Sequence, residues 1–511
     1  MRLQTAFAAL ISTTAASFPA RLAQRHSDVG LVERQAYPYP AFTINQIIDH
    51  FPESPRYEPH PKGTFKQRYF FDDTYYKPGG PVYLYLSGET SGTSRFSSLQ
   101  TGIIQILMEA TNGLGVILEN RYYGQSFPYN DSSTDHLAFL TTEQTIADNA
   151  YFAQHAVFPG VGGNLTAPGT PWILYGGSLA GAQTAFSVKT YGDILYGGIG
   201  SSATTKAVLA YPVWYDPIQK FAPQDCVASI NAIIEKMDTL VATKNQAAIQ
   251  ELKAIFGLEA LSDIRDFAMT IAFTLGGPMN YPTSTWQELN WYPAYSANDF
   301  WNFCGNVSNI DAPSSVTEVD WILANYTAGE PWVNLGNYAN YFKINFLPLC
   351  PEGVSLDSTE CFGTQNTCTE AGLYQVAKSE PPRLISEVLQ VDYTQQWCNW
   401  AFPKGKYNAI PSTPDLERVN VYGGYSVEAD RLAHIDGGVD VWLDVCFHSH
   451  FAPARVSTDL RPEYLIAGGG HHWDSYGILD VAAEPNYIRE AHLWEIRTVK
   501  KWLRDFGSWK R

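Results

Sequence analysis

A short apolar run that ends in two glycines and a serine constrains the fold of this chain more than any other stretch. Residues 172–175 have the composition of a buried strand, Gly176 and Gly177 follow at once, and residues 179–188 have the small side chains of a closely packed helix. A serine at the apex of such a strand–turn–helix unit sits on a strained backbone, and a Cβ on its neighbours would collide with the adjoining strand or helix. The stretch therefore predicts a nucleophile elbow with Ser178 as the nucleophile.

The elbow pattern departs from its usual form at one position. The usual pattern is G-x-S-x-G, whereas this chain has Ala180 in the last place and the glycine one residue later, at Gly181. The alternative interpretation is a glycine-rich turn that merely opens a buried helix. Because nucleophile elbows belong to α/β-hydrolases, the remaining chain should supply an acid and a histidine, in that order, at later strand ends.

Short apolar runs alternate with helical spacing on both sides of the elbow, which predicts a mostly parallel sheet. The expected strands are 64–71, 81–87, 113–119, 195–199, 431–435 and 464–467, and the expected helices are 142–157 and 485–506. Between them, residues 224–396 are helical and loop-rich, with the clearest helix at 230–256. We therefore expect an α/β-hydrolase domain in two parts, 41–204 and 426–511, with a helical cap inserted at 205–425.

The two strand ends after the insertion carry the remaining chemistry. Asp440 follows the strand expected at 431–435, and His471 follows the strand expected at 464–467. Ser178, Asp440 and His471 thus obey the order serine, acid, histidine. In such a triad the serine attacks, the histidine takes its proton, and the aspartate holds the imidazole in the right tautomer. The backbone N–H of Leu179 is expected to form half of the oxyanion hole.

Spacing alone leaves the acid and the base open. Asp436 and Asp444 compete with Asp440, and His472 cannot be separated from His471. The remaining candidates, His434, His448 and His450, have the settings of surface or packing residues. No His, Cys or Asp spacing is typical of a metal site, so we expect neither a metal nor another cofactor.

The N-terminus and the composition indicate a secreted protein. A basic start, a short apolar core and small residues make 1–20 a signal peptide. The polar and basic run that follows makes 21–40 a propeptide or N-terminal extension. The formal net charge of −17 argues against nucleic acid or an acidic membrane surface as a partner. Secretion implies that most of the seven cysteines are paired. Glycosylation sequons begin at Asn130, Asn164, Asn306 and Asn325.

With these residues in place, the chain resembles the serine peptidase family of lysosomal Pro-X carboxypeptidase and dipeptidyl peptidase II, which includes fungal secreted prolyl peptidases. Its most specific marker is Glu119-Asn-Arg-Tyr-Tyr-Gly-Gln-Ser126, close to the family's E-H-R-Y-Y-G-E-S. Residues 176–181 match G-G-S-Y-x-G, in which the residue before the last glycine is free. Residues 440–442 match D-P-W, and the run that ends His471-His-Trp-Asp474 matches G-x-H-H-L-D, whose first histidine is the base.

The resemblance implies an α/β-hydrolase with a disulfide-stapled helical cap that cleaves peptides after proline or a small residue. The resemblance and the positions of the cysteines favour Cys226–Cys304 and Cys368–Cys398 bridges. Cys446, six residues beyond Asp440, is the candidate for an unpaired thiol. Trp442 would be an aromatic wall for proline, and Glu89 would hold a substrate's free amine. We expect exopeptidase action, of the dipeptidyl peptidase or the Pro-X carboxypeptidase type, with a slight preference for dipeptide release.

Four alternatives remain open on the sequence alone. A prolyl endopeptidase would need a site open at both ends, whereas an esterase or lipase would use the same triad on another substrate. A secreted binding protein on a degenerate hydrolase scaffold would have no need for a full triad. A vacuolar or lysosome-like compartment is the alternative destination to the extracellular space. The oligomeric state is left undetermined by the sequence.

Overall fold

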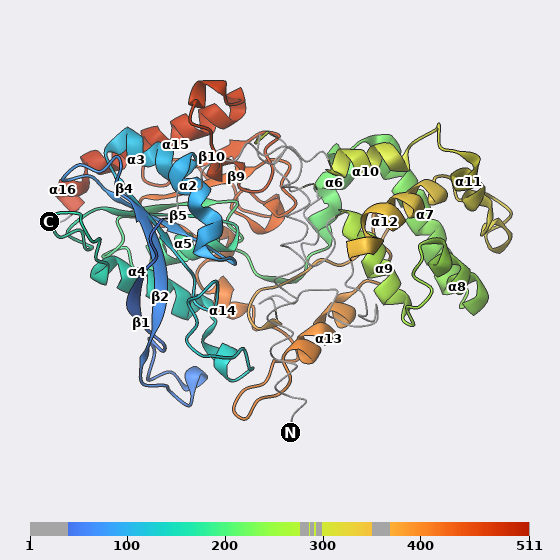
Figure 1. Cartoon of the computed structure of the whole chain (residues 1–511), viewed down its shortest axis with the longest axis horizontal. Helices are drawn as coiled ribbons and strands as arrows, with labels where there is room; N and C mark the ends of the chain where they lie inside the picture. The colour runs from blue at the N-terminus through green and yellow to red at the C-terminus, as the bar shows by residue number, and fades with distance from the viewer. Residues whose placement is uncertain (1–38, 276–285, 287–290, 293–298, 350–367, 510–511) are drawn as a thin grey trace. The chain divides into compact units, whose positions relative to one another are not determined.

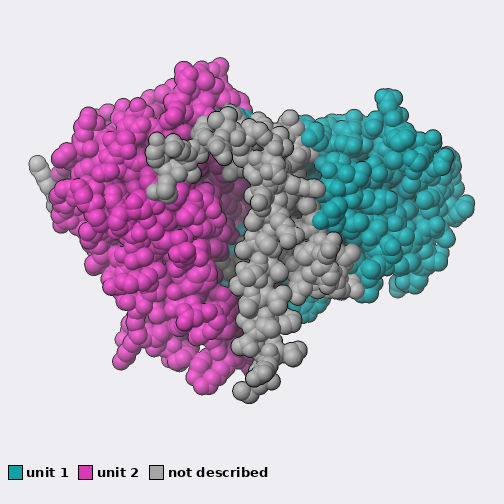
Figure 2. Space-filling view, viewed as in Figure 1, with its two compact units in different colours: residues 1–34, 208–403, 410–414 teal, residues 35–207, 404–409, 415–511 magenta. Residues whose placement is uncertain are grey.

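The computed structural model describes residues 39–275, 286, 291–292, 299–349 and 368–509. These residues divide into two compact units, which Figure 2 draws in different colours. One unit, here called the hydrolase unit, comprises the described residues of 35–207, 404–409 and 415–511. The other, here called the helical unit, comprises those of 208–403 and 410–414.

Within the described part of the hydrolase unit, the core is an eight-stranded sheet in the order β1-β2-β4-β3-β5-β6-β9-β10 (Figure 1). The strands are β1 (Phe42–Ile47), β2 (Thr64–Asp72), β3 (Val82–Leu86), β4 (Leu114–Leu118), β5 (Trp172–Gly177), β6 (Gly197–Ser201), β9 (Leu432–Gly437) and β10 (Glu463–Ile466). The neighbours from β4 to β10 run parallel, while β2 is antiparallel to β1 and to β4. The chain therefore has the α/β-hydrolase fold.

Alternate residues of the central strands build two apolar layers, one on each face of the sheet. On one face, Tyr83, Ile173 and Tyr175 pack with α3 (Ile103–Thr111) and α15 (Asn486–Arg504). On the other, strand residues that include Val82, Leu84, Trp172 and Leu174 pack with α4 (Thr142–His155) and the start of α5 (Leu179–Thr190). Strands buried on both faces explain why these segments read as continuous apolar runs.

The helical unit begins at residue 208, after β6, and ends at residue 414, before β9. It is therefore an insertion between two neighbouring strands of the sheet. Its longer helices are α7 (Gln224–Ala242), α8 (Gln246–Ile255), α9 (Ile264–Ala272), α10 (Asp299–Val307), α12 (Leu335–Asn345) and α13 (Val391–Ala401). A short parallel pair, β7 (Val208–Ala210) and β8 (Gly372–Tyr374), completes it.

Two disulfides lie in the helical unit. Cys226 of α7 is bonded to Cys304 of α10, and Cys368 is bonded to Cys398 of α13. Cys446, in the hydrolase unit, is a buried free thiol. Cys350 and Cys361 lie outside the described residues.

Three features differ from the expected elements. Residues 230–256 form two helices rather than one, because Lys244 has a positive φ of 57° and Asn245 caps the second helix by accepting the N–H of Ala248. The antiparallel strand β1 was not expected. Residues 415–425, expected in the insertion, belong to the hydrolase unit, where Tyr422 stacks on Phe186 of α5.

Candidate active site

The turn between β5 and α5 has the geometry of a nucleophile elbow. Ser178 lies between them with φ 59° and ψ −128°, a strained conformation for a residue with a side chain. A Cβ on Gly176 would lie 2.2 Å from the carbonyl oxygen of Ala180, so the turn closes only with glycine there. The N–H of Ser178 donates to the carbonyl of Ser201 at the end of β6 (2.9 Å). The serine is half-buried, at the carboxyl end of a parallel strand.

An acid and a histidine meet at the neighbouring strand ends. Nδ1 of His471 lies 2.8 Å from Oδ2 of Asp440. The other oxygen of Asp440 accepts the backbone N–H of Trp442 at 2.8 Å, which fixes the carboxylate in the turn after β9. Both side chains are buried, so the ion pair or hydrogen bond between them is little weakened by water. Because Nδ1 faces the acid, the other ring nitrogen of His471 is left for the reacting groups.

The two competing aspartates bind other histidines. Asp436 lies 2.7 Å from Nδ1 of His448 and also accepts that residue's backbone N–H. Asp444 lies 2.9 Å from Nδ1 of His450. The structure therefore brings Asp440, rather than either rival, to His471.

His472 lies beneath the elbow. It has a left-handed backbone (φ 42°), and its N–H donates to the hydroxyl of Ser202 (2.9 Å). A Cβ on Gly177 would lie 2.9 Å from its ring, so the imidazole packs against the residue before the nucleophile. Desolvation by the surrounding protein lowers the pKa of His472 well below its usual value, and the positive charges of His471 and Arg95 act in the same direction. His472 is therefore expected to be neutral, and its ring packs against the elbow.

Backbone donors for an oxyanion are expected at the start of α5 and in the loop after β3. Leu179 is the first residue of α5, and N–H groups in the first turn of a helix have no partner within that helix. The loop after β3 approaches this turn, because a Cβ on Gly88 would lie 3.4 Å from the Cβ of Ala180. In the α/β-hydrolase arrangement, the second oxyanion donor comes from this loop.

The same loop carries two charges of opposite sign. Glu89 is exposed, and Arg95 donates from Nε to the carbonyl of Ser87 (3.1 Å). Desolvation by the surrounding protein raises the pKa of Glu89, while the positive charges of Arg95 and His471 act to lower it. Sequence reasoning selected Glu89 as the charge near the substrate and missed Arg95, which has no motif of its own.

Trp442 supplies an aromatic surface beside the histidine. Its ring centroid lies 6.5 Å from that of His471, tilted by 45°, and the side chain is buried. A flat apolar face next to the base suits a proline ring or a small side chain.

The marker motif at 119–126 builds the support of the site rather than its reacting groups. Glu119 accepts hydrogen bonds from the side chains of Arg68 and Ser126 and from the N–H groups of Gly92 and Gln125. Burial alone would raise the pKa of Glu119, but these hydrogen bonds hold it below its usual value. The loop after β4 is thereby tied to β2 and to the loop after β3.

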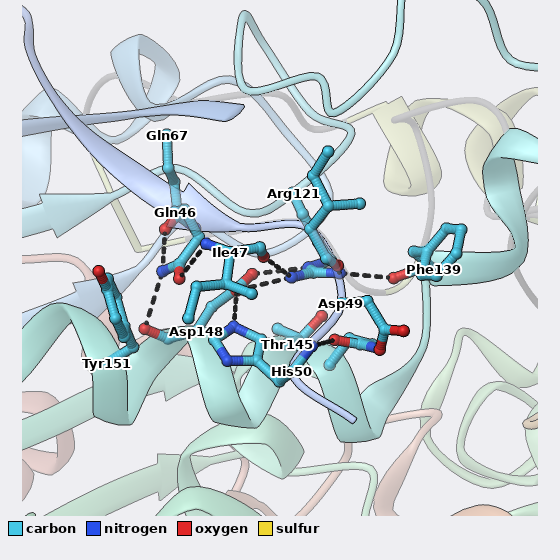
Figure 3. Close-up of polar contacts among 12 residues, drawn as sticks. Gln46, Ile47, Asp49, His50, Gln67, Arg121, Phe139, Thr145, Asp148 and Tyr151 are labelled. Atoms are coloured by element: carbon cyan, nitrogen blue, oxygen red, sulfur yellow. Dashed lines mark hydrogen bonds and ion pairs between the residues drawn. The ribbon is translucent and has the colours of Figure 1, made fainter. Parts of the chain in front are cut away.

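Arg121, from the same motif, is the centre of the buried network in Figure 3. Its guanidinium binds Asp148 of α4 through two contacts of 2.6 and 2.7 Å. It also donates to the carbonyls of Ile47, Ile48 and Phe139. This network joins β1, α4 and the loop after β4, so the most specific sequence marker of this chain is structural.

The remaining predicted site residues lie at the surface. Asn130, Asn164, Asn306 and Asn325 are all exposed, and Asn164 accepts hydrogen bonds from the backbone and the hydroxyl of Thr166. Over the described ranges, no three His, Cys, Asp or Glu side chains are grouped so that they could hold a metal ion. Nor does the described part of the chain contain a helix of the length and apolarity that a membrane crossing requires.

Comparison with known proteins identifies a family for this chain. The sequence model of the family described as serine carboxypeptidase S28 matches residues 46–491. A probable extracellular serine carboxypeptidase of Arthroderma benhamiae is 38% identical over 94% of this chain and 71% of its own length. The lysosomal Pro-X carboxypeptidase of Homo sapiens is 32% identical over 92% and 89%, respectively. The thymus-specific serine protease of Homo sapiens is 26% identical over 78% and 76%.

Proposed function

This chain belongs to the serine carboxypeptidase S28 family, and we propose that it is a secreted exopeptidase that removes residues from the carboxyl end of peptides. It is a serine-type peptidase, as the family implies. The observation that carries the proposed mechanism is the 2.8 Å contact between His471 Nδ1 and Asp440 Oδ2, at strand ends beside the strained elbow of Ser178. A serine, a histidine and an acid at the carboxyl ends of parallel strands in one sheet are the parts needed for acyl transfer.

The proposed reaction passes through an acyl-enzyme. Ser178 Oγ attacks the scissile carbonyl carbon while His471 takes its proton, and Asp440 holds the imidazole in the tautomer that can accept it. The N–H of Leu179 and an N–H of the loop after β3 bind the oxyanion. His471 then gives its proton to the leaving nitrogen, the C–N bond breaks, and water, activated by the same histidine, releases the second product.

The positive charge of Arg95, on the loop after β3, supports recognition of a carboxylate. When one residue is released from a C-terminus, its carboxylate carbon is separated from the scissile carbonyl carbon by one nitrogen and one Cα, about 4 Å in all. A cation for that carboxylate must therefore lie close to the oxyanion donors. Arg95 is bonded to Ser87 in this loop, and guanidinium is suited to bidentate binding of a carboxylate. The same arginine also acts on Glu89, the group that would instead favour a substrate amine, because its positive charge lowers the pKa of that carboxyl.

Further observations support a preference for proline or a small residue before the cleaved bond, and support secretion. Trp442 offers an apolar face beside His471 for proline or a small residue before the cleaved bond. A relative with 32% identity is named for Pro-X carboxypeptidase activity. The signal-like N-terminus, two disulfides, exposed sequons and a relative named as extracellular all suit secretion.

Mass spectrometry of peptide products tests the proposal. Four versions of one Pro-containing peptide would carry free or acetylated N-termini and free or amidated C-termini. We expect loss of the C-terminal residue from both peptides with a free C-terminus, and little cleavage of the amidated pair. Release of N-terminal dipeptides from the amidated peptide with a free amine would contradict carboxypeptidase action. Internal cleavage of the doubly blocked peptide at a comparable rate would indicate an endopeptidase.

A further inference from the structure

A buried aspartate close to the histidine links segments that are far apart in the sequence. Asp474, three residues after His471, is 1% exposed. Its Oδ2 accepts the hydroxyl of Tyr175 at 2.5 Å, and its Oδ1 accepts the hydroxyl of Ser201 at 2.6 Å. Both oxygens of the carboxylate are thus engaged by hydroxyl donors from other strands.

These two donors lie on the strands that hold the nucleophile. Tyr175 is on β5, three residues before Ser178, and its ring stacks on Tyr85 of β3 at 5.6 Å. Ser201 is the last residue of β6, and its carbonyl accepts the N–H of Ser178. Through these side chains, Asp474 is connected to the strand before the nucleophile and to the group that fixes the nucleophile's own backbone.

The backbone of Asp474 is held from the opposite side by α15. His492 Nε2 lies 2.9 Å from the carbonyl oxygen of Asp474, and His492 Nδ1 lies 2.8 Å from Glu484 Oε2. Because a carbonyl only accepts, Nε2 of His492 carries the hydrogen and donates to the carbonyl of Asp474. The segment that follows His471 is therefore fixed on both its side-chain and its backbone face.

The distance between the strands makes the relative placement of the serine and the histidine depend on links between them. In the sheet order β6 and β9 lie between β5 and β10, so three strand spacings, about 14 Å, separate the strand before Ser178 from the strand before His471. Proton transfer requires the serine and the imidazole to be within hydrogen-bond reach, and a misplacement of about 1 Å costs about 100-fold in rate. Asp440 sets the orientation of the ring but contacts neither β5 nor β6 in the bonds described above.

We propose that Asp474 is a positioning residue, which sets the placement of His471 relative to Ser178 by joining the segment after β10 to β5 and β6. It acts through Tyr175 and Ser201 and does not touch the substrate. The role rests on the proposed function of Ser178 and His471. It differs from simple structural support, because loss of the link should reduce the rate of the folded enzyme and not only its stability.

The test is the Asp474→Asn variant, which keeps the size of the side chain. One carboxylate oxygen becomes an amide nitrogen, so a donor faces the hydroxyl of Tyr175 or of Ser201. Its kcat and KM would be measured with a Pro-containing peptide, together with the rate of reaction with a fluorophosphonate, which reports the reactivity of Ser178 without peptide binding. We expect kcat and the fluorophosphonate rate to fall by about 10- to 100-fold, with KM within about threefold of the wild-type value.

Asp49→Asn is the matched control. Asp49 is also buried and accepts hydrogen bonds from Phe51 N and Gln144 Nε2, but it follows β1, four places from β5 in the sheet order. Any loss of stability in this variant should leave kcat of the folded enzyme unchanged. If Asp474→Asn fails to fold, Ser201→Ala, which removes a single hydroxyl, takes its place, with an expected drop in kcat of about 3- to 10-fold.

The outcomes separate the two proposals. A wild-type fluorophosphonate rate and kcat in folded Asp474→Asn, or in Ser201→Ala if that variant replaces it, would overturn the positioning role alone. So would an equal loss of kcat in Asp49→Asn. Failure of the wild-type enzyme to react with the probe at Ser178 would overturn the proposed function, and the positioning role with it.

Discussion

His471 and Asp440 are joined through Nδ1 and Oδ2 at 2.8 Å, at the ends of two neighbouring parallel strands. Asp440→Asn replaces one acceptor oxygen of the carboxylate by an amide nitrogen, which donates. If this nitrogen faces His471, Nδ1 has no acceptor for its hydrogen, and the imidazole favours the wrong tautomer. We expect kcat to fall by about 10³- to 10⁴-fold with a small change in KM. Steady-state kinetics on a Pro-containing peptide would measure the loss.

Asp444→Asn is the control for this variant, because Asp444 follows the same strand but binds His450. Its kcat should stay close to the wild-type value. If Asp444→Asn lost as much activity as Asp440→Asn, the acid would be wrongly assigned.

The Arg121–Asp148 pair in Figure 3 should be a determinant of stability. Asp148→Asn leaves a fully buried guanidinium without its counter-charge, so the free energy of unfolding should fall by about 3–5 kcal/mol. Urea unfolding would measure it. The exposed Arg418–Asp415 pair is the comparison, since Arg418→Gln should cost less than about 1 kcal/mol. Equal losses in the two variants would contradict a supporting role for the buried pair.

This network shows where sequence reasoning succeeded and where it stopped. The marker at 119–126 identified the family, yet its physical role became visible only when Arg121 and Asp148 met in the folded chain. The elbow and the central strands were predictable because buried parallel strands leave continuous apolar runs and the tight turn requires glycine. β1 was not predicted, although its residues alternate in polarity as in a half-buried strand. Its place in the sheet depends on pairing with β2, to which the side-chain bond between Gln46 and Gln67 contributes.

The contribution of Glu495 to stability should decline as the pH rises above about 4.3. Burial raises the pKa of Glu495 well above its usual value, the charges of Asp474 and Glu484 add to the shift, and neither of its carboxyl oxygens has a hydrogen-bond partner in the described structure. Glu495 is then protonated when folded but ionised when unfolded above about pH 4.3. The unfolded state binds fewer protons, so stability is fully present below that pH and is lost by up to about 1.4 kcal/mol per pH unit until the folded pKa is reached.

Glu495→Gln tests this sign. We expect the urea unfolding midpoint to fall less, or to rise more, between pH 5 and pH 7 in this variant than in the wild-type enzyme. Glu490→Gln, on the exposed face of the same helix, should behave like the wild-type enzyme. An unchanged or steeper fall in Glu495→Gln would show that the side chain is ionised in the folded protein.

Arg95 and Glu89 would bind opposite ends of a peptide: the arginine a C-terminal carboxylate, the glutamate an N-terminal amine. If Arg95 binds the terminal carboxylate, Arg95→Gln should raise KM by about 10- to 100-fold for peptides with a free C-terminus, because a charge-assisted bond is lost. The variant should make little difference for amidated peptides. A rise in KM confined to Glu89→Gln, and to peptides with a free N-terminus, would instead assign the site to an amine.

The partners of individual side chains in the site could not be predicted from residue spacing. Spacing along the chain gives the order of serine, acid and histidine, but it cannot show that Asp440 rather than Asp436 reaches His471. Nor can it show that Asp474 bonds to Tyr175, which lies 299 residues away. Such partners are set by which strand ends lie together, and a single sequence does not contain that information.

Turnover by Ser178→Ala, compared with the wild-type enzyme at equal folded concentration, tests the central claim most directly. The substitution removes the attacking oxygen and leaves the elbow backbone in place, so circular dichroism and the unfolding midpoint should not change. We predict that kcat for a Pro-containing peptide falls by at least about 10³-fold. A folded Ser178→Ala enzyme that kept more than about 5% of wild-type turnover, far above what a triad without its nucleophile can supply, would contradict the account.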